Sequence, residues 1–88
     1  MYSGRDEQVT LRCTMEMADV IIDRFGHDVL MRPSPDGKTF DVTVKVSASH
    51  VFLTWVMNFG ENMKIVAPDH VIEQQIHMAE NILKMYRK

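Results

Sequence analysis

Residues 51–71 read VFLTWVMNFGENMKIVAPDHV, and this stretch decides the fold of the chain. Four apolar residues recur at i, i+3, i+4 and i+7, which predicts that they share one face of a helix: Phe52, Trp55, Val56 and Phe59. Gly60 follows where a left-handed helix end belongs. Residues 63–67 form a short, mostly apolar run typical of a strand, and Pro68 stands where a new helix can begin. The stretch therefore predicts a helix, a strand and a second helix.

The N-terminal part of the chain shows a similar order of patterns. Residues 8–14 alternate apolar and polar side chains, which predicts a half-buried strand. Residues 15–25 change to helical spacing, and Gly26 ends the expected helix. Residues 29–33 are predicted to form a short second strand, which Pro33 favours at the edge of a sheet.

The middle and the end of the chain complete the pattern. Residues 34–37, Ser-Pro-Asp-Gly, are a strong turn signal, and residues 39–46 again alternate as a strand. Ser47 or Ser49 is suited to cap the next helix. A last helix is predicted over residues 69–86, with charged residues on much of one face and with apolar side chains at helical spacing on the other: Ile72, Ile76, Ala79, Leu83 and Tyr86.

The two halves of the sequence repeat each other. VTLRC at 9–13 matches VTVKV at 42–46 in residue type, and VIIDRFG at 20–26 matches TWVMNFG at 54–60. The order βαβ followed by βαβ predicts an α+β protein with the ferredoxin-like split βαβ fold, βαββαβ, and an added C-terminal helix. Right-handed crossovers place the first and third strands in the centre of an antiparallel sheet and both helices on one face. The other face of the sheet is then left open.

Length and composition exclude several classes of protein. The 88 residues fit one domain over 8–88, and we expect residues 1–7 to be a linker or a cloning remnant on a C-terminal piece of a longer protein. The formal net charge of −2 gives no overall attraction to nucleic acid or to an anionic membrane. No apolar run approaches the ~20 residues of a membrane span, and no signal peptide is visible. A single cysteine, Cys13, excludes an intrachain disulfide and suits a cytoplasmic protein.

The open face of the sheet is the best candidate for a ligand site. Thr10 and Arg12 are expected beside Thr43 and Lys45 on this face, and Arg32 of the neighbouring edge strand is close enough to join them. Hydroxyls and cations on a flat sheet suit a phosphate or carboxylate ligand. The alternative is that all five are ordinary solvated strand residues. No aromatic residue is expected on this face, which disfavours base stacking but leaves contact with a nucleic-acid backbone open.

Metal binding and catalysis have weak support. None of the four histidines has another at i+3 or i+4, so no metal and no cofactor is expected: His27, His50, His70 and His77. Cys13 falls on the buried side of its strand, where a small core residue is more common than a nucleophile. We therefore expect a protein that is not an enzyme.

Eight methionines and one tryptophan are open to two interpretations. Four of the methionines suit either an adaptable surface for a protein partner or the core, and the core is favoured for most of them: Met57, Met63, Met78 and Met85. Trp55 is predicted to anchor the core.

Taken together, these residues resemble a known family. The pattern VTLRC…VIIDRFG…PDGKTFDVTVKVS…FLTWVMNFGENMKIVAP…V, from about residue 9 to residue 86, is similar to WCX, the C-terminal extension of bacterial WYL-domain transcriptional regulators. The resemblance implies an N-terminal helix-turn-helix and a central WYL domain upstream in the same polypeptide. It also implies a sensor unit that binds a nucleotide-like ligand or single-stranded DNA and helps to hold a homo-oligomer.

Two functions outside this family share the predicted topology. An ACT-like regulatory domain would bind an amino acid between two copies, but the first loop lacks the glycines that allow close backbone approach. An acylphosphatase-like enzyme needs an anion-cradling loop after the first strand, and Cys-Thr-Met-Glu-Met at 13–17 has no glycine and carries a carboxylate. The regulator is the leading hypothesis, the ACT-like domain is the alternative, and the enzyme is rejected.

Overall fold

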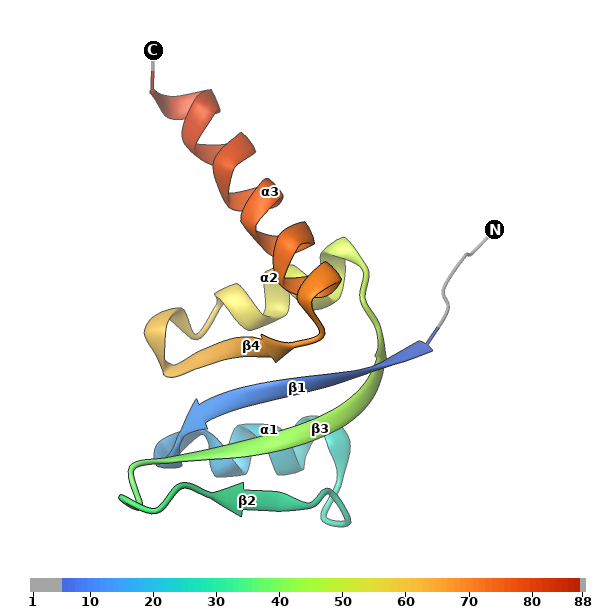
Figure 1. Cartoon of the computed structure of the whole chain (residues 1–88), viewed down its shortest axis with the longest axis vertical. Helices are drawn as coiled ribbons and strands as arrows, with labels where there is room; N and C mark the ends of the chain where they lie inside the picture. The colour runs from blue at the N-terminus through green and yellow to red at the C-terminus, as the bar shows by residue number, and fades with distance from the viewer. Residues whose placement is uncertain (1–5, 88) are drawn as a thin grey trace.

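The computed structural model describes residues 6–87 and contains a single four-stranded sheet (Figure 1). The elements follow in the order β1 (Asp6–Thr14), η1 (Met15–Met17), α1 (Ala18–Phe25), β2 (Met31–Pro33), β3 (Thr39–Ser47), α2 (His50–Met57), η2 (Gly60–Asn62), β4 (Met63–Ala67) and α3 (Asp69–Tyr86). The two short η elements are 3-10 turns. Every helix and strand predicted from the sequence is present, with differences at the ends.

The sheet has the strand order β2-β3-β1-β4, and each neighbouring pair is antiparallel. The first and third strands are therefore central, and the proline-containing β2 lies at an edge, as predicted. In Figure 1, α1 and α2 lie behind the sheet, and α3 leaves the end of β4 and rises away from it. The predicted ferredoxin-like α+β fold with an added C-terminal helix is confirmed.

The core lies between the sheet and helices α1 and α2. The inward side chains of both central strands meet one residue of α1 and three of α2, and all are at most 4% exposed: Val9, Leu11, Cys13, Phe40, Val42, Val44, Ile21, Phe52, Leu53 and Val56. Their strict alternation along β1 and β3 places every second residue on the opposite, open face. The fold thus presents that face without a helix of its own.

Local hydrogen bonds explain where the helices differ from the predicted ranges. Residues 15–17 form a 3-10 turn before α1, so the predicted helix over 15–25 is divided. Helix α2 ends at Met57 because the Phe59 N–H donates to the Val56 carbonyl, a tighter i to i+3 bond that closes the last turn. Gly60 follows with a φ of +58°, the left-handed conformation predicted for it.

Two further predictions concern residues next to the core. Ser49 caps α2, since its side chain accepts a hydrogen bond from the Phe52 N–H at 3.4 Å. Trp55 is half-buried and contacts the rings of Phe25 and Phe59 edge to face, at centroid distances of 5.7 and 5.1 Å. The Arg24 guanidinium lies over the Trp55 ring, 5.4 Å from its centroid. Trp55 therefore joins α1 to α2 at the margin of the core.

Helix α3 is held to the rest of the domain by its first turns. Val71 is fully buried, and the Gln75 side chain donates a hydrogen bond to the Leu53 carbonyl of α2. The later turns project from the body (Figure 1). Over residues 6–87, no helix combines the length and the apolar character needed to cross a membrane.

Candidate functional site

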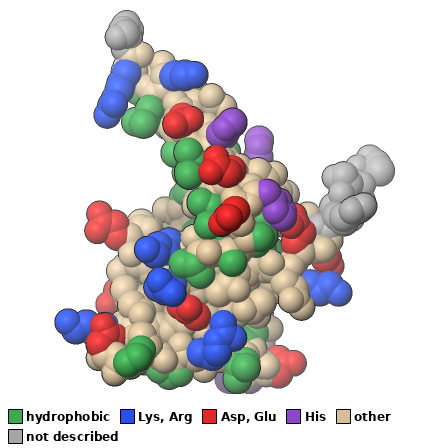
Figure 2. Space-filling model, in the orientation of Figure 1, with side chains coloured by type: hydrophobic (Ala, Val, Ile, Leu, Met, Phe, Trp, Pro, Cys, Tyr) green, Lys and Arg blue, Asp and Glu red, His purple; other side chains and the backbone are tan. Residues whose placement is uncertain are grey.

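One charged residue from each strand lies at the same level on the open face of the sheet. Arg32 of β2 is opposite Asp41 of β3, Asp41 is opposite Arg12 of β1, and Arg12 is opposite Lys64 of β4. We call these four residues the charge row. Figure 2 looks onto this face and shows Lys and Arg side chains gathered with acidic ones over the sheet. Three cations and one carboxylate give the row a net positive charge.

The centre of the charge row is a two-point ion pair. Arg12 Nε lies 2.9 Å from Asp41 Oδ1, and Arg12 Nη2 lies 3.1 Å from Asp41 Oδ2. The hydrogen bond from Arg12 and the positive charges of Arg12 and Arg32 hold the pKa of the Asp41 carboxyl below its usual range. Asp41 in turn raises the pKa of Arg12. The two hydrogen bonds hold the guanidinium in one orientation relative to the Asp41 carboxylate.

The two outer cations of the row have no such partner. Among residues 6–87, neither Arg32 nor Lys64 makes an ion pair within 4.0 Å, and both are exposed. Neighbouring strands are about 4.8 Å apart, so Lys64 and Arg12 lie side by side and Arg32 lies two strands from Arg12. Both ends of the row are therefore available to an anion.

Of the remaining predicted site residues, the structure brings two next to the charge row and leaves one apart from it. Thr10 and Thr43 are opposite each other, next to the charge row, and their hydroxyl oxygens are 2.9 Å apart. Lys45 lies opposite Gln8, four residues beyond Asp41 on the same strand, which is about 13 Å along β3. Arg12, Arg32 and the threonines thus come together, whereas Lys45 stands apart from them.

A shallow hollow lies beside the row where β2 turns into β3. Its volume is about 380 Å³, and both guanidiniums and the Asp41 carboxylate line it together with Pro33, Ser34, Pro35 and Thr39. The turn is built as the sequence predicts, because the Gly37 N–H donates to the Ser34 carbonyl and Gly37 has a φ of +72°. The hollow is suited to a small oxyanion held by two guanidiniums.

Two members of the charge row were missing from the residues predicted from sequence. Lys64 stands between Met63 and Ile65, which are both buried, so the alternation along β4 already indicates an outward lysine. Asp41 lies on the outward side of its strand, but its contact with Arg12, 29 residues away in sequence, depends on the register of the two strands. The alternation of apolar and polar residues predicts which face of the sheet a side chain occupies, but not which residue of the neighbouring strand lies opposite it.

Among the described residues, neither a reactive thiol nor a cluster of metal ligands is found. Cys13 is 1% exposed, and burial raises its pKa to about 11, so the thiol is protonated at neutral pH. No group of three or more histidine, cysteine, aspartate and glutamate side chains that could hold a metal ion occurs in the described part of the chain. His70 contacts Glu7, and the other three histidines are exposed. The arrangement offers cations, hydroxyls and one carboxylate on a flat surface.

Comparison with known protein families gives one match that covers most of the chain. The family model described as WCX domain matches residues 5–83, from just before β1 into the last turns of α3. A search of curated proteins gives no match. The matched range contains the whole sheet and every residue of the charge row.

Proposed function

This chain belongs to the WCX domain family of regulatory domains, and on that basis we propose that it is the non-catalytic regulatory part of a bacterial WYL-type transcriptional regulator. In this proposal it acts through self-association and through assistance to the binding of a nucleotide-like ligand or single-stranded DNA. The helix-turn-helix that contacts an operator and the WYL domain belong to the upstream part of the polypeptide. A reading frame upstream of Met1 that encodes both would support this assignment, and a stop codon directly before Met1 would contradict it.

The charge row is the observation that supports an anionic ligand. Its three cations lie on a flat exposed surface, each on a different strand, and within residues 6–87 only Arg12 is paired with a carboxylate. A nucleic-acid backbone or a nucleotide phosphate is attracted to such a surface through its charge. None of the outward strand residues within 6–87 is aromatic, so contacts to phosphates and not to bases are expected to dominate.

The paired Arg12 contributes orientation as well as charge. Asp41 holds the guanidinium in one position, which lowers the entropy lost when an anion binds to its exposed edge. Arg12 retains an exposed side chain, with 46% of its surface accessible. Arg32 and Lys64 then approach the anion from the two sides of the row.

The test is the salt dependence of binding to a fluorescein-labelled oligothymidine, measured by fluorescence anisotropy on the longer protein that contains the WYL domain. Replacing two outer cations together, Arg32→Gln with Lys64→Gln, is expected to weaken binding and to reduce the log–log salt slope by about 0.7 for each phosphate that the variant no longer neutralises. Arg24→Gln removes one charge from the helix side of the domain and serves as the control. Lys45→Gln tests the residue that was predicted from sequence but lies apart from the charge row.

Three results would decide between interpretations. Unchanged affinity and slope in the double variant would exclude the charge row from the ligand site. A larger effect of Lys45→Gln than of the double variant would move the site toward the far end of the sheet. Binding of a free amino acid in equilibrium dialysis, without binding of the oligonucleotide, would favour the ACT-like function.

A further inference from the structure

The projecting part of α3 carries an apolar stripe that nothing in the described residues covers. We call Ile76, Ala79, Leu83 and Tyr86 the α3 stripe; they lie on one side of the helix at i, i+3, i+7 and i+10. Ile76 is 43% exposed, Leu83 46% and Tyr86 79%. Figure 2 shows hydrophobic side chains following one side of this helix down to the body of the domain. An exposed stripe of this length on a helix is typical of a helix that packs against another.

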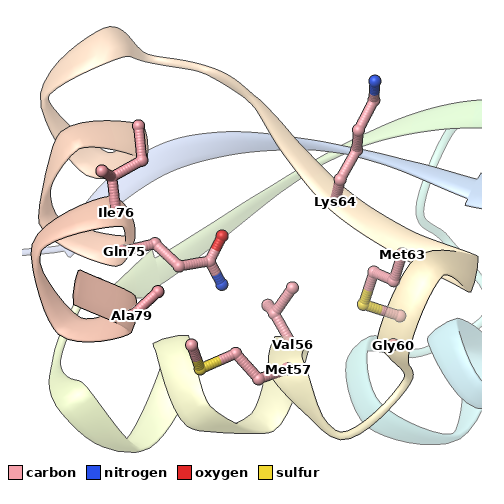
Figure 3. A pocket seen from close by; sticks show the side chains of 8 residues that line it. All are labelled: Val56, Met57, Gly60, Met63, Lys64, Gln75, Ile76 and Ala79. Carbon is pink, nitrogen blue, oxygen red and sulfur yellow. The ribbon is translucent and has the colours of Figure 1, made fainter. Parts of the chain in front are cut away.

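The stripe runs into an apolar groove at the foot of the helix. The groove has a volume of about 480 Å³ and lies between α2, β4 and α3, with eight lining residues: Val56, Met57, Gly60, Met63, Lys64, Gln75, Ile76 and Ala79. In Figure 3, Val56, Met57 and Gln75 point into this space, while the Lys64 side chain extends away from it. Two methionines give the groove walls that adapt to the shape of an inserted side chain.

The charges beside the stripe favour one particular occupant. At 3.6 residues per turn, the charged side chains of α3 lie on one flank of the stripe. The acidic residues Asp69, Glu73 and Glu80 come first, Lys84 lies in the last turn, and Arg87 follows directly after the helix. A second copy of α3 running antiparallel would set the basic end of each helix beside the acidic part of the other. In a parallel pair the charged flanks of the two helices would lie on opposite sides and would not meet.

We propose that two copies of this chain associate through antiparallel pairing of their α3 helices, with the last turns of each helix seated in the groove of the other. This inference rests on the self-association proposed above and specifies its surface. A two-fold axis makes the contact isologous, so each copy supplies both a groove and a protruding end. The antiparallel arrangement also opposes the two helix dipoles. The pairing covers the α3 stripe and fills the groove with side chains such as Leu83 and Tyr86.

The first experiment measures the dimer dissociation constant of the 88-residue chain by sedimentation equilibrium. Leu83→Glu is expected to raise this constant by about a hundredfold or more, because a charge is buried at a central position and the change is made twice. Val51→Glu is the matched control, since Val51 is 74% exposed on α2 and belongs neither to the stripe nor to the lining of the groove. Circular dichroism of each variant checks that the fold is retained.

The second experiment determines the orientation of the helices by disulfide crosslinking. Equal amounts of a Glu73→Cys chain and an Arg87→Cys chain are mixed and oxidised, while the buried Cys13 stays unreactive. Antiparallel pairing predicts that the mixed 73–87 disulfide dominates. A mixed product no more abundant than the 73–73 and 87–87 products would overturn the inference.

The outcomes separate the surface from the proposed self-association itself. A chain that remains monomeric at high concentration would refute both. A dimer that survives Leu83→Glu would retain self-association but exclude α3 as its surface. Protection of Leu83 and Tyr86 by the WYL domain of the same polypeptide, seen by hydrogen exchange in a monomeric longer protein, would assign the stripe to that domain and overturn the inference.

Discussion

The attachment of α3 to the body can be tested at Val71, the one fully buried side chain of this helix. Val71→Ala removes the equivalent of two methylene groups from the core, worth about 1.6 kcal/mol at ~0.8 kcal/mol each. A residual cavity adds to this loss, and the higher helix propensity of alanine returns about 0.5 kcal/mol. We expect the free energy of unfolding to fall by about 1.5–2 kcal/mol, a large share of the stability of a domain of this size.

The control is a larger truncation on the same helix. Ile82→Ala removes more atoms than Val71→Ala, but Ile82 is 43% exposed and lies beyond the body. Its effect on the monomer is expected to stay within about 0.5 kcal/mol. The contrast between the two variants therefore depends on burial and not on the size of the change.

Urea unfolding at low micromolar concentration provides the measurement. Trp55 is the only tryptophan and reports on the contact between α1 and α2. Ellipticity at 222 nm reports mainly on α3, which has 18 residues against 8 in each of the other helices. Coincident curves would show that α3 unfolds together with the body. Equal losses in the two variants, or no loss in Val71→Ala, would refute the conclusion that Val71 attaches the helix.

Three further predictions concern single residues of the sheet and its connections. Gly60→Ala should lower the free energy of unfolding by about 1–2 kcal/mol; the cause would be left-handed backbone strain and not a clash, because no atom lies within 4 Å of the added Cβ. Gly60→Asn should cost less, and equal urea midpoints for the two variants would contradict this prediction. Cys13, with a pKa of about 11, should react with a disulfide reagent at pH 8 only when urea unfolds the chain, and a fast reaction in native buffer would show that the thiol is accessible. The Asp41 carboxyl has a lowered pKa in the fold, so its stabilising contribution is present above its unfolded value of about 3.9 and is lost as the pH falls through the folded value. Asp41→Asn should therefore reduce the loss in free energy of unfolding at acidic pH. An unchanged loss would show that the ion pair with Arg12 contributes nothing to stability.

Much of the fold could be predicted because its local signals agree with one another. Alternation along residues 39–46 identifies a strand and its inward face, and the Ser-Pro-Asp-Gly turn fixes where the preceding edge strand must reverse. The proline in β2 and the repeat of the two halves then leave one strand order. These signals act over a few residues each, which is why they can be read without a structure.

The ends of the helices were less predictable for a physical reason. Phe59 continues the apolar spacing of α2, yet it lies outside the helix because a tighter hydrogen bond closes the last turn before it. Apolar spacing reports which face is buried and does not report the hydrogen-bond pattern of the backbone. The same limit explains the 3-10 turn before α1.

The candidate site was predicted by face but not by position along the strands. Thr10, Arg12 and Thr43 were assigned correctly to the open face, and so was Lys45. Only the register of β1 and β3 shows that Arg12 contacts Asp41 and that Lys45 lies two residues further along β3 than Thr43. Lys64 could have been identified from the buried residues on either side of it, because the alternation along β4 is as clear as in the longer strands.

The central position of β1 has a consequence for how the domain assembles. Its partners are β3 and β4, so the first strand of the chain pairs with one from the middle and one from the second half. During synthesis, the inward side chains of β1, such as Val9 and Leu11, therefore remain exposed until β3 and then β4 have been made. Contacts between such distant segments slow folding but make it cooperative. A nascent chain interrupted before Met63 would lack β4 and would leave one edge of β1 unpaired and open to chaperones and proteases.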